Sequence, residues 1–313
     1  MLDTEKMESL MKVRYTEAFY SVQGEGRWVG VPSVFLRVFG CNFECAGFGQ
    51  ERGNLIPTEE MPYMKDPRAD KNSEIAYKSI DELPVTPIGC DSSASWSMKY
   101  KHLQLTETIE QVQERIEALL PNGRYDERED IHLVITGGEP LLGWQRVWPE
   151  LLEMCKEIGL KNVTYETNGT QNLQQQFIDY LNGDGKDIHV TWSTSPKLSI
   201  SGEDQFDALI PEALLDMNMV SNSHLYNKFV VRDIEDFAEV DEFVEAYKEA
   251  GVKLDAVYCM PEGATLEQQH LTAKGVADAC MQTGYKYSPR PVSYTHLRAH
   301  ETGRNLVCRL LLE

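Results

Sequence analysis

Short apolar runs alternate along the chain with segments in which apolar residues recur at helical spacing. The apolar runs have the length and the β-branched or aromatic content of buried strands, at 33–39, 131–136, 162–166, 188–192, 226–231 and 256–260. Helical patterns lie between many of them, at 108–119, 145–158, 234–249 and 266–282. Strands that alternate with helices predict an α/β fold with a parallel sheet and right-handed crossovers. This pattern does not separate an open sheet from an incomplete barrel.

The helix over 108–119 carries the clearest start signal. Thr108 and Gln111 have the spacing of a capping box, in which each side chain bonds to the other residue's backbone N–H. Ile109, Val112 and Ile116 then fall on one helical face. The sequence therefore predicts that this helix begins at Thr108.

Residues 46–89 interrupt the alternation of strands and helices. They are rich in glycine, proline and charge and contain few apolar runs. An irregular segment of this length is usually functional or disordered. We therefore treat 46–89 as an insertion in a single domain that spans 1–290.

The last residues of the chain do not resemble protein sequence. The string VSYTHLRAHET, from Val292, and the string LVCRLLLE, which ends at Glu313, are translations of a transposase-based DNA-sequencing adapter. Such a segment is excluded from reasoning about the fold. We expect 291–313 to be an adapter translation and not native sequence.

Composition narrows the classes of function. The formal net charge is −20, which repels phosphate backbones and argues against nucleic-acid binding. The sequence has no run of about 18 apolar residues, so no membrane span is expected. The N-terminal residues mix charges throughout and lack an apolar signal core, so a cytoplasmic protein is expected. Seven unevenly spaced cysteines in such a chain suggest metal or cluster chemistry before disulfides.

Two of these cysteines follow the predicted strand 33–39. Cys41 and Cys45 lie in the segment GCNFEC, and loops after strands are where α/β folds place their chemistry. A Cys-x3-Cys pair alone fits two small buried residues equally well. In a Cys-x3-Cys-x2-Cys iron–sulfur motif the third cysteine would stand three positions after Cys45, but that position is Phe48.

A set of further segments resembles the 7-carboxy-7-deazaguanine synthase family of the radical S-adenosylmethionine superfamily. The segments are FYSVQGEG at 19–26, RVFGC at 37–41, GCDSSASW at 89–96, TGGEP at 136–140, ETNGT at 166–170, STSPK at 193–197 and KYSPR at 286–290. The resemblance covers about 19–45 and 89–290. It places Cys90 in the third cysteine position, with 46–89 inserted before it. It also implies an incomplete β/α barrel of TIM type with about six parallel strands.

The resemblance implies the cofactors and the residues that bind them. Cys41, Cys45 and Cys90 would ligate a 4Fe–4S cluster whose remaining iron stays open for S-adenosylmethionine, and thiolates suit iron in such clusters. The expected S-adenosylmethionine site consists of Gly137, Gly138, Glu139, Glu166, Asn168, Ser193, Ser195 and Lys197. Ser92 stands where the family coordinates Mg²⁺ through a hydroxyl, and magnesium prefers such oxygen ligands.

The resemblance also implies the reaction. A carbon–nitrogen lyase of queuosine or 7-deazapurine biosynthesis would convert 6-carboxy-5,6,7,8-tetrahydropterin to 7-carboxy-7-deazaguanine with loss of ammonia. Gln23, Glu25, Gly26 and Arg37 would bind the substrate, with Arg37 gripping its carboxylate in two-pronged fashion. The expected partners are a reductant such as flavodoxin or ferredoxin and a second copy of the chain in a homodimer.

Alternatives remain open at the level of the sequence. One is another radical S-adenosylmethionine enzyme, such as a glycyl-radical activase. A second is a non-catalytic zinc- or cluster-binding regulatory protein, whose fourth ligand would be Cys155, Cys259 or Cys280, although these cysteines fit small buried positions better. A third is a degenerate relative in which the insertion displaces Cys90. We also expect the insertion to fold over the opening of the cluster site.

Overall fold

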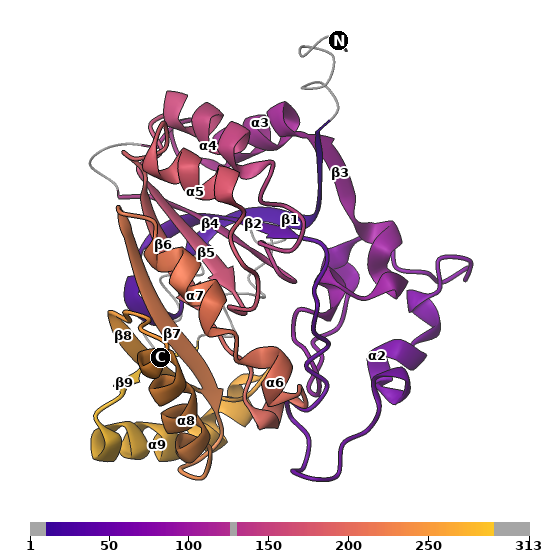
Figure 1. Ribbon diagram of the computed structural model, residues 1–313. Helices are drawn as coiled ribbons and strands as arrows, with labels where there is room; N and C mark the ends of the chain where they lie inside the picture. The colour runs from indigo at the N-terminus through magenta and orange to yellow at the C-terminus, as the bar shows by residue number, and fades with distance from the viewer. Residues whose placement is uncertain (1–10, 126–129, 291–313) are drawn as a thin grey trace.

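The computed structural model describes residues 11–125 and 130–290, and within them it shows one sheet of nine strands (Figure 1). The strand order is β3-β1-β2-β4-β5-β6-β7-β8-β9. The expected adapter segment, 291–313, lies outside the described residues. Among the helices that are described, none has both the length and the apolar character of a membrane span.

The parallel part of the sheet confirms the predicted strands. All six are present, as β2 (Pro32–Val38), β4 (His132–Gly137), β5 (Asn162–Thr167), β6 (His189–Thr194), β7 (Ser223–Val231) and β8 (Ala256–Pro261). They pair in parallel in that order, and the short β9 (Lys286–Tyr287) adds to β8 in the same direction. The α/β class with a mostly parallel sheet is therefore as predicted.

The antiparallel edge of the sheet was not predicted. β1 (Lys12–Val22) pairs with β2 on one side and with β3 (Leu105–Thr108) on the other. The register of β1 against β2 shifts between Tyr15 and Glu17. Several residues of β1 that face the cavity are polar. The strand therefore lacks the regular apolar pattern by which a strand is recognised in a sequence.

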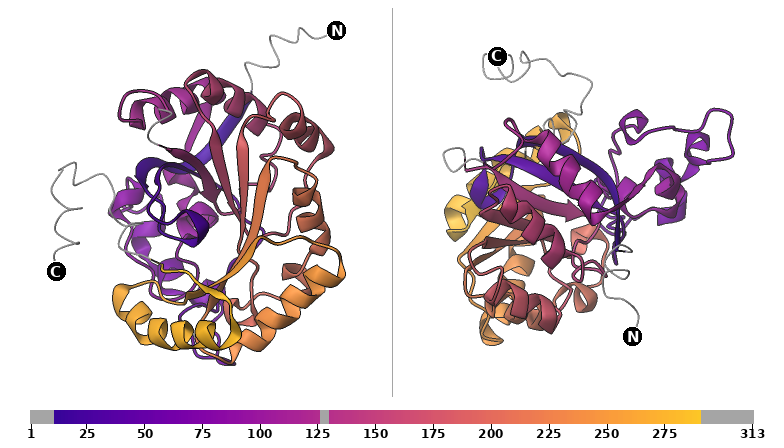
Figure 2. Two further views of the ribbon diagram at one scale, coloured as in Figure 1. Left: turned by 90° about the vertical axis from the view of Figure 1, so that its left-hand side faces the viewer. Right: turned by 90° about the horizontal axis from the view of Figure 1, so that it is seen from above.

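Helices line the outer face of the curved sheet (Figure 2). They are α3 (Ile109–Leu119), α4 (Trp148–Glu157), α5 (Gln175–Asn182), α6 (Gln205–Ala208), α7 (Pro211–Asn218), α8 (Asp236–Glu249) and α9 (Leu266–Thr283). The predicted capping box at Thr108 and Gln111 is present, and a second one begins α9. The helices α5, α6 and α7 were not predicted.

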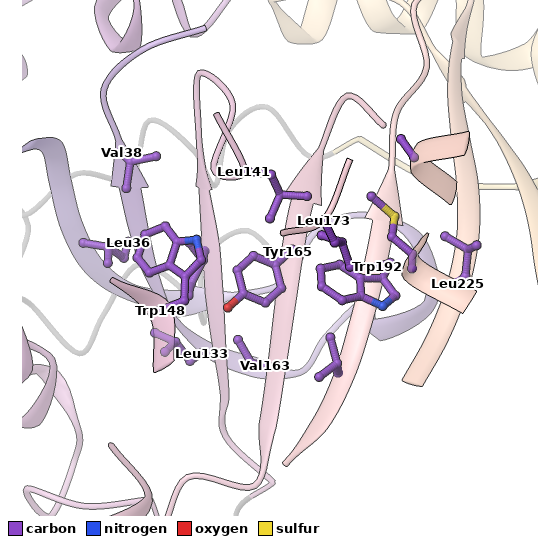
Figure 3. Packing of buried hydrophobic residues seen from close by; sticks show 14 of the residues in the cluster. Leu36, Val38, Leu133, Leu141, Trp148, Val163, Tyr165, Leu173, Trp192 and Leu225 are labelled. Carbon is purple, nitrogen blue, oxygen red and sulfur yellow. The ribbon is translucent and has the colours of Figure 1, made fainter. Parts of the chain in front are cut away.

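Alternating residues of the strands divide the sheet into two faces. On the outer face, Tyr165 of β5 stacks on Trp192 of β6 with ring centroids 5.1 Å apart, and Trp148 of α4 packs beside them (Figure 3). These three side chains are fully buried. The apolar residues of each strand thus anchor the helices, and the residues between them point to the inner face.

The insertion forms a small unit beside the sheet. Its regular elements are short: η2 (Thr58–Glu60), α2 (Pro62–Lys65), η3 (Pro67–Ala69) and η4 (Ile80–Glu82). Met61, Tyr63 and Tyr77 pack with Tyr100 in a separate hydrophobic cluster. Figures 1 and 2 show this part extending outward from the sheet.

The position of the insertion corrects the expectation that it folds over the cluster opening. Of residues 46–89, only Phe48 lines the central cavity. The two ends of the insertion are held together, because the N–H of Gly89 donates to the carbonyl of Phe48 at 2.7 Å. The aromatic and methionine side chains between them pack against one another, and Met61 and Tyr63 also lie beside Gly89.

Candidate functional site

A cavity of about 250 Å³ lies where the inner face of the sheet meets the loops at the strand ends. Thirteen of the residues expected from the sequence line it: Gln23, Glu25, Arg37, Cys41, Cys45, Cys90, Ser92, Gly137, Gly138, Glu166, Asn168, Ser195 and Lys197. Three others, Gly26, Glu139 and Ser193, are not among its lining residues. The site predicted from separate motifs is therefore brought together in one place.

The three expected cluster cysteines share this cavity. Cys41 follows β2, Cys45 lies four residues later, and Cys90 returns to them after the insertion. Burial raises the pKa of Cys41 to about 12 and also raises the pKa of Cys45 and Cys90. The ammonium group of Lys197 opposes this shift at all three thiols. The cavity thus holds three neutral thiols that face one cation. A metal centre would convert these thiols to thiolates.

The loop that carries Cys45 is fixed by a carboxylate. Cys45 has a positive φ of 49°, which is uncommon for a residue other than glycine. Glu203 accepts the backbone N–H of Glu44 at 2.9 Å and that of Cys45 at 2.6 Å. These two hydrogen bonds hold the thiol of Cys45 toward the cavity in a backbone conformation that side chains disfavour.

The two glycines of TGGEP allow two strand ends to meet closely. A Cβ on Gly138 would lie 2.2 Å from the carbonyl oxygen of Gly40, and one on Gly137 would lie 2.2 Å from that of Val38. The N–H of Glu139 donates to the same carbonyl of Gly40 at 2.7 Å. Only glycine permits this approach, which sets the backbone of TGGEP directly beside the loop of Cys41.

Glu139 has a different position from the one expected. Its carboxylate is fully buried and accepts hydrogen bonds from the hydroxyl of Thr167 at 2.7 Å and from the N–H groups of Leu141 and Asn168 at 3.0 and 2.7 Å. Burial raises its pKa despite these bonds. The carboxylate therefore joins the ends of β4 and β5 from behind the cavity wall.

The loop after β5 and the loop after β6 supply amides, a hydroxyl and a cation. Asn168 donates to the side-chain oxygen of Asn42 at 2.9 Å, which ties it to the loop of Cys41. Lys197 donates to the hydroxyl of Ser195 at 3.2 Å. Both lie beside the cysteines, where a zwitterionic ligand would find donors and a positive charge.

Glu166 is a junction of three donors. It accepts from Gln23 Nε2 at 3.0 Å, from the hydroxyl of Ser193 at 2.9 Å and from Lys228 Nζ at 2.7 Å. Ser193 thus contributes by orienting Glu166, which explains why it does not line the cavity itself. Glu166 is part of the motif ETNGT at the end of β5, and its bond to Gln23 also connects it to the β1 side of the cavity.

Arg37 is already held by protein groups. Its Nε pairs with Glu17 at 3.0 Å, and one terminal nitrogen donates to the hydroxyl of Ser92 at 3.3 Å. The hydroxyl of Ser92 in turn donates to Asp91 at 3.1 Å. The guanidinium is fixed in orientation and keeps further N–H groups for a ligand carboxylate.

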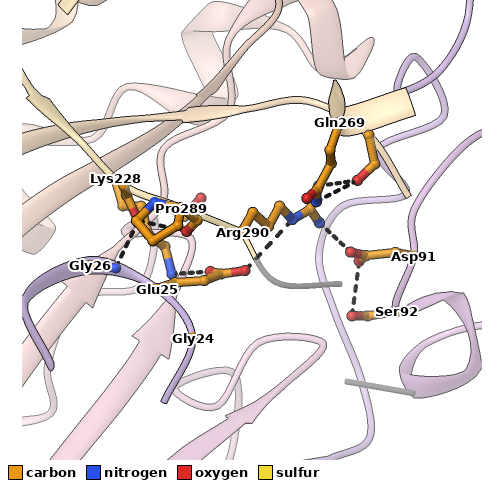
Figure 4. A network of polar contacts seen from close by, with 12 residues as sticks. Gly24, Glu25, Gly26, Asp91, Ser92, Lys228, Gln269, Pro289 and Arg290 are labelled. Atoms are coloured by element: carbon orange, nitrogen blue, oxygen red, sulfur yellow. Dashed lines mark hydrogen bonds and ion pairs between the residues drawn. The ribbon is translucent and has the colours of Figure 1, made fainter. Parts of the chain in front are cut away.

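Glu25 lies between two cations (Figure 4). Lys228 Nζ is 2.6 Å from one oxygen, and Arg290 Nε is 3.6 Å from the other. Burial alone would raise the pKa of Glu25, but Lys228 and Arg290 lower it. Arg290 also forms an ion pair with Asp91. Burial alone would raise the pKa of Asp91, but Arg290 lowers it.

Gly26 supports this loop without facing the cavity. Its φ is +67°, and its N–H donates to the hydroxyl of Ser288 at 2.8 Å. A Cβ at this position would lie 2.6 Å from the hydroxyl oxygen of Tyr226. The glycine is required by packing, and it is not among the residues that line the cavity.

Four residues that line the cavity were not predicted as site residues: Glu17, Asp91, Lys228 and Arg290. A signal existed for Lys228, because it is a charged residue in the middle of the apolar strand YNKFVV, and lysine is rarely buried unless it is paired. Arg290 lies in KYSPR, but only the tertiary structure brings it to Glu25 and Asp91.

Within residues 11–125 and 130–290, no three histidine, cysteine or acidic side chains lie close enough to share one metal ion. A 4Fe–4S cluster binds each cysteine through a different iron, so its ligands need not converge on one point. Cys155, Cys259 and Cys280 are buried as predicted, and they do not line the cavity.

Comparison with known proteins gives the same family as the motifs. No protein-family model matches the chain. The chain is 26% identical over 287 residues to the 7-carboxy-7-deazaguanine synthase of Pyrobaculum aerophilum, which covers 91% of this chain and 95% of that protein. It is 28% identical over 291 residues to the enzyme of the same name from Halobacterium salinarum, and this match covers 88% of this chain and 86% of that protein.

A solved structure supports the fold. The crystal structure of QueE from Escherichia coli matches with a TM-score of 0.50 and 18% identity, over 92% of this chain and 98% of that one. The relatives span almost the whole chain, including the cysteine loops on both sides of the insertion. The chain is therefore similar to 7-carboxy-7-deazaguanine synthases over most of its length.

Proposed function

We propose that this protein is a 7-carboxy-7-deazaguanine synthase, a carbon–nitrogen lyase that acts on 6-carboxy-5,6,7,8-tetrahydropterin. The names of its relatives support this function over a glycyl-radical activase or a regulatory metal protein. The observation that carries the proposal is the shared cavity of Cys41, Cys45 and Cys90. These cysteines come from loops that are separated by the insertion, and they meet the polar strand ends that the family motifs supply.

The three cysteines are proposed to hold a 4Fe–4S cluster. The fit rests on three thiols in one cavity, a nearby cation at Lys197 and no fourth cysteine among the lining residues. When bound, the cluster supplies an electron that cleaves S-adenosylmethionine and generates the radical chemistry of the superfamily. The protein's own residues bind and orient the reactants and keep water out.

The S-adenosylmethionine site is proposed to lie between the cysteine loops and the ends of β4, β5 and β6. Gly137 and Gly138 expose backbone beside Cys41, and Asn168, Ser195 and Lys197 add polar groups. Lys197 suits the carboxylate of the ligand. Glu139 acts from behind the wall by fixing the backbone of Asn168.

The substrate is proposed to lie on the opposite side of the cavity, toward β1. Arg37, held by Glu17, would bind the pterin carboxylate, and Gln23 and Glu25 would bind ring atoms. Ser92 would contribute a hydroxyl to Mg²⁺, between Arg37 and Asp91. Such a set of polar groups discriminates strongly, because a ring with the wrong donors leaves buried groups unpaired.

The remaining features of the proposal rest on the family. They are an incomplete barrel as the shape of the sheet, a flavodoxin- or ferredoxin-type reductant, a homodimer and a cytoplasmic location. The division of the chain into a domain at 1–290 and a foreign tail at 291–313 also stays a prediction.

The test compares Cys90→Ala with Cys155→Ala under anaerobic conditions. We expect about four irons per chain, S-adenosylmethionine cleavage and formation of 7-carboxy-7-deazaguanine in the unmodified protein. Cys90→Ala should lose all three. Cys155→Ala removes a thiol that is buried in the core of α4 and should keep them. A full cluster in Cys90→Ala would show that the third ligand has been misassigned, and a cluster without turnover of the carboxypterin would disprove the proposed substrate.

A further inference from the structure

Lys228 occupies a position in the cavity that no family motif explains. It lies on the inner face of β7, and its side chain is 4% exposed. Its ammonium group lies 2.6 Å from Glu25 and 2.7 Å from Glu166. Burial alone would lower the pKa of Lys228, but Glu166 and Glu25 raise it, so the lysine is charged. A buried cation with two anionic partners is costly to desolvate and calls for a reason.

The two carboxylates come from separate parts of the chain. Glu25 lies in the loop after β1, and Glu166 lies at the end of β5. Among the described residues, Lys228 alone bonds to both carboxylates, whereas Gln23 bonds only to Glu166 of the two and Arg290 pairs only with Glu25 of the two. The lysine thus ties the loop of QGEG to the sheet at the substrate side of the cavity (Figure 4).

Lys228 supplies most of the positive charge that faces Glu25 and Glu166. The other ionisable groups that act on the three residues are Arg290 and Asp91 near Glu25, and Tyr226 of the same strand near Lys228. Arg290 is shared with Asp91, and among the described residues no cation other than Lys228 bonds to Glu166. Without Lys228, two buried carboxylates would face the same space, and one of them would take up a proton.

We propose that Lys228 is a positioning residue that holds Glu25 and Glu166 together as a pair of anionic hydrogen-bond acceptors for the N–H groups of the substrate ring. The inference rests on the proposed function and deepens it. Each carboxylate oxygen can accept more than one hydrogen bond, so the pair keeps acceptor capacity for a ligand. A ring edge rich in N–H donors fits this pair, and an edge that presents acceptors is rejected.

The test uses Lys228→Met, which keeps the length and apolar stem of the side chain and removes its charge. We expect binding of the carboxypterin to the anaerobic holoprotein, measured by calorimetry, to weaken by at least about 30-fold. Infrared difference spectra should show a new band from a protonated carboxyl group, because Glu166 loses its cation. Adding Glu166→Gln should abolish that band without restoring binding. The infrared measurement needs no substrate.

A second pair of variants keeps the test decisive if Lys228→Met does not fold. The two proteins to compare are Glu166→Gln and the double variant Glu166→Gln with Lys228→Met. They differ only in the lysine, and neither leaves two buried carboxylates without a cation. The lysine should still strengthen binding about tenfold in this background, because it orients Glu25. Arg232→Met is the matched control, because it removes a cation from the buried carboxylate of Glu262 outside the main cavity. It should leave binding unchanged.

The outcomes separate the inference from the proposed function. If Lys228→Met binds the carboxypterin like the unmodified protein and shows no protonated carboxyl band, the lysine only fills space and the inference is wrong. Equal binding by the two Glu166→Gln proteins would overturn it as well. If the unmodified protein does not bind the carboxypterin, the proposed function fails, and the infrared band still decides whether Lys228 keeps the carboxylates ionised.

Discussion

The sheet with its helices and the insertion at 46–89 are stabilised in different ways. The sheet is anchored by one continuous hydrophobic core that includes Trp148, Tyr165 and Trp192. The insertion has a small cluster of its own around Met61, and many of its other contacts are turns and ion pairs. Stability scales with buried apolar area, so the two regions should differ strongly in their resistance to unfolding.

The difference explains how a long insertion can separate Cys45 from Cys90, which line the same cavity. Its ends meet at the hydrogen bond between Gly89 and Phe48, and Gly49 donates to Glu262 at 2.8 Å. Cys90 is therefore placed by contacts at the base of the insertion. We expect the cysteines to keep their positions when the rest of the insertion loosens.

The largest effect is expected in the core of the sheet. Trp192→Ala removes a fully buried ring that stacks on Tyr165 and packs edge-on against Phe177. The free energy of unfolding should fall by about 3–5 kcal/mol, because the cavity left behind cannot collapse fully. Chemical denaturation measures this value. A loss below 1 kcal/mol would mean that the core is not the main source of stability.

A smaller and local effect is expected in the insertion. Met61→Ala removes a fully buried side chain from the small cluster. We expect a loss of about 2 kcal/mol that appears as faster amide hydrogen exchange in 50–88. Exchange in the sheet and the iron content should not change. If iron is lost together with protection of the insertion, the separation between the two regions is wrong.

The same contrast explains how far the fold could be predicted from the sequence. The six parallel strands and the helices α3, α4, α8 and α9 were predicted because each buries a regular apolar pattern against the core. β1 was missed, because its inner face carries Glu17 and Ser21 toward the cavity. The insertion was recognised only by the absence of a pattern, and a cluster of tyrosines and methionines leaves no periodic signal.

The candidate site could be predicted only where a motif marks it. The three cysteines and the residues after β4, β5 and β6 lie at strand ends, so their meeting follows from a parallel sheet. The pairing of Glu25 with Lys228 and Arg290 joins residues more than 200 positions apart, and spacing along the chain carries no information on it. Glu139 lies behind the cavity wall, and a motif alone does not tell whether a carboxylate faces the ligand or that wall.

The contact between the two regions should contribute less than either core. Arg52 of the insertion pairs with Asp233, Glu235 and the buried Asp236 at the start of α8. Arg52→Met should cost about 1 kcal/mol, because the arginine is partly exposed and solvent screens the pairs. Thermal melting at low and high salt measures the effect, which should shrink as salt is added to the unmodified protein. A salt-independent loss would indicate that the arginine acts by packing.

The smallest effect should appear only in acid and only in the insertion. The hydrogen bond from Arg68, together with that from Tyr77 at 2.6 Å, lowers the pKa of Asp66 to about 2. An acid with a lowered pKa stabilises the folded state above its unfolded value of about 3.9, and this contribution is lost as the pH falls toward 2. The protection of amides in 50–88, measured relative to the intrinsic exchange rate at each pH, should therefore be independent of this group above about pH 5 and fall between about pH 4 and 2. Asp66→Asn should show less protection at neutral pH and a weaker fall of protection in acid. An unchanged acid dependence in this variant would assign the effect to other carboxylates of the insertion.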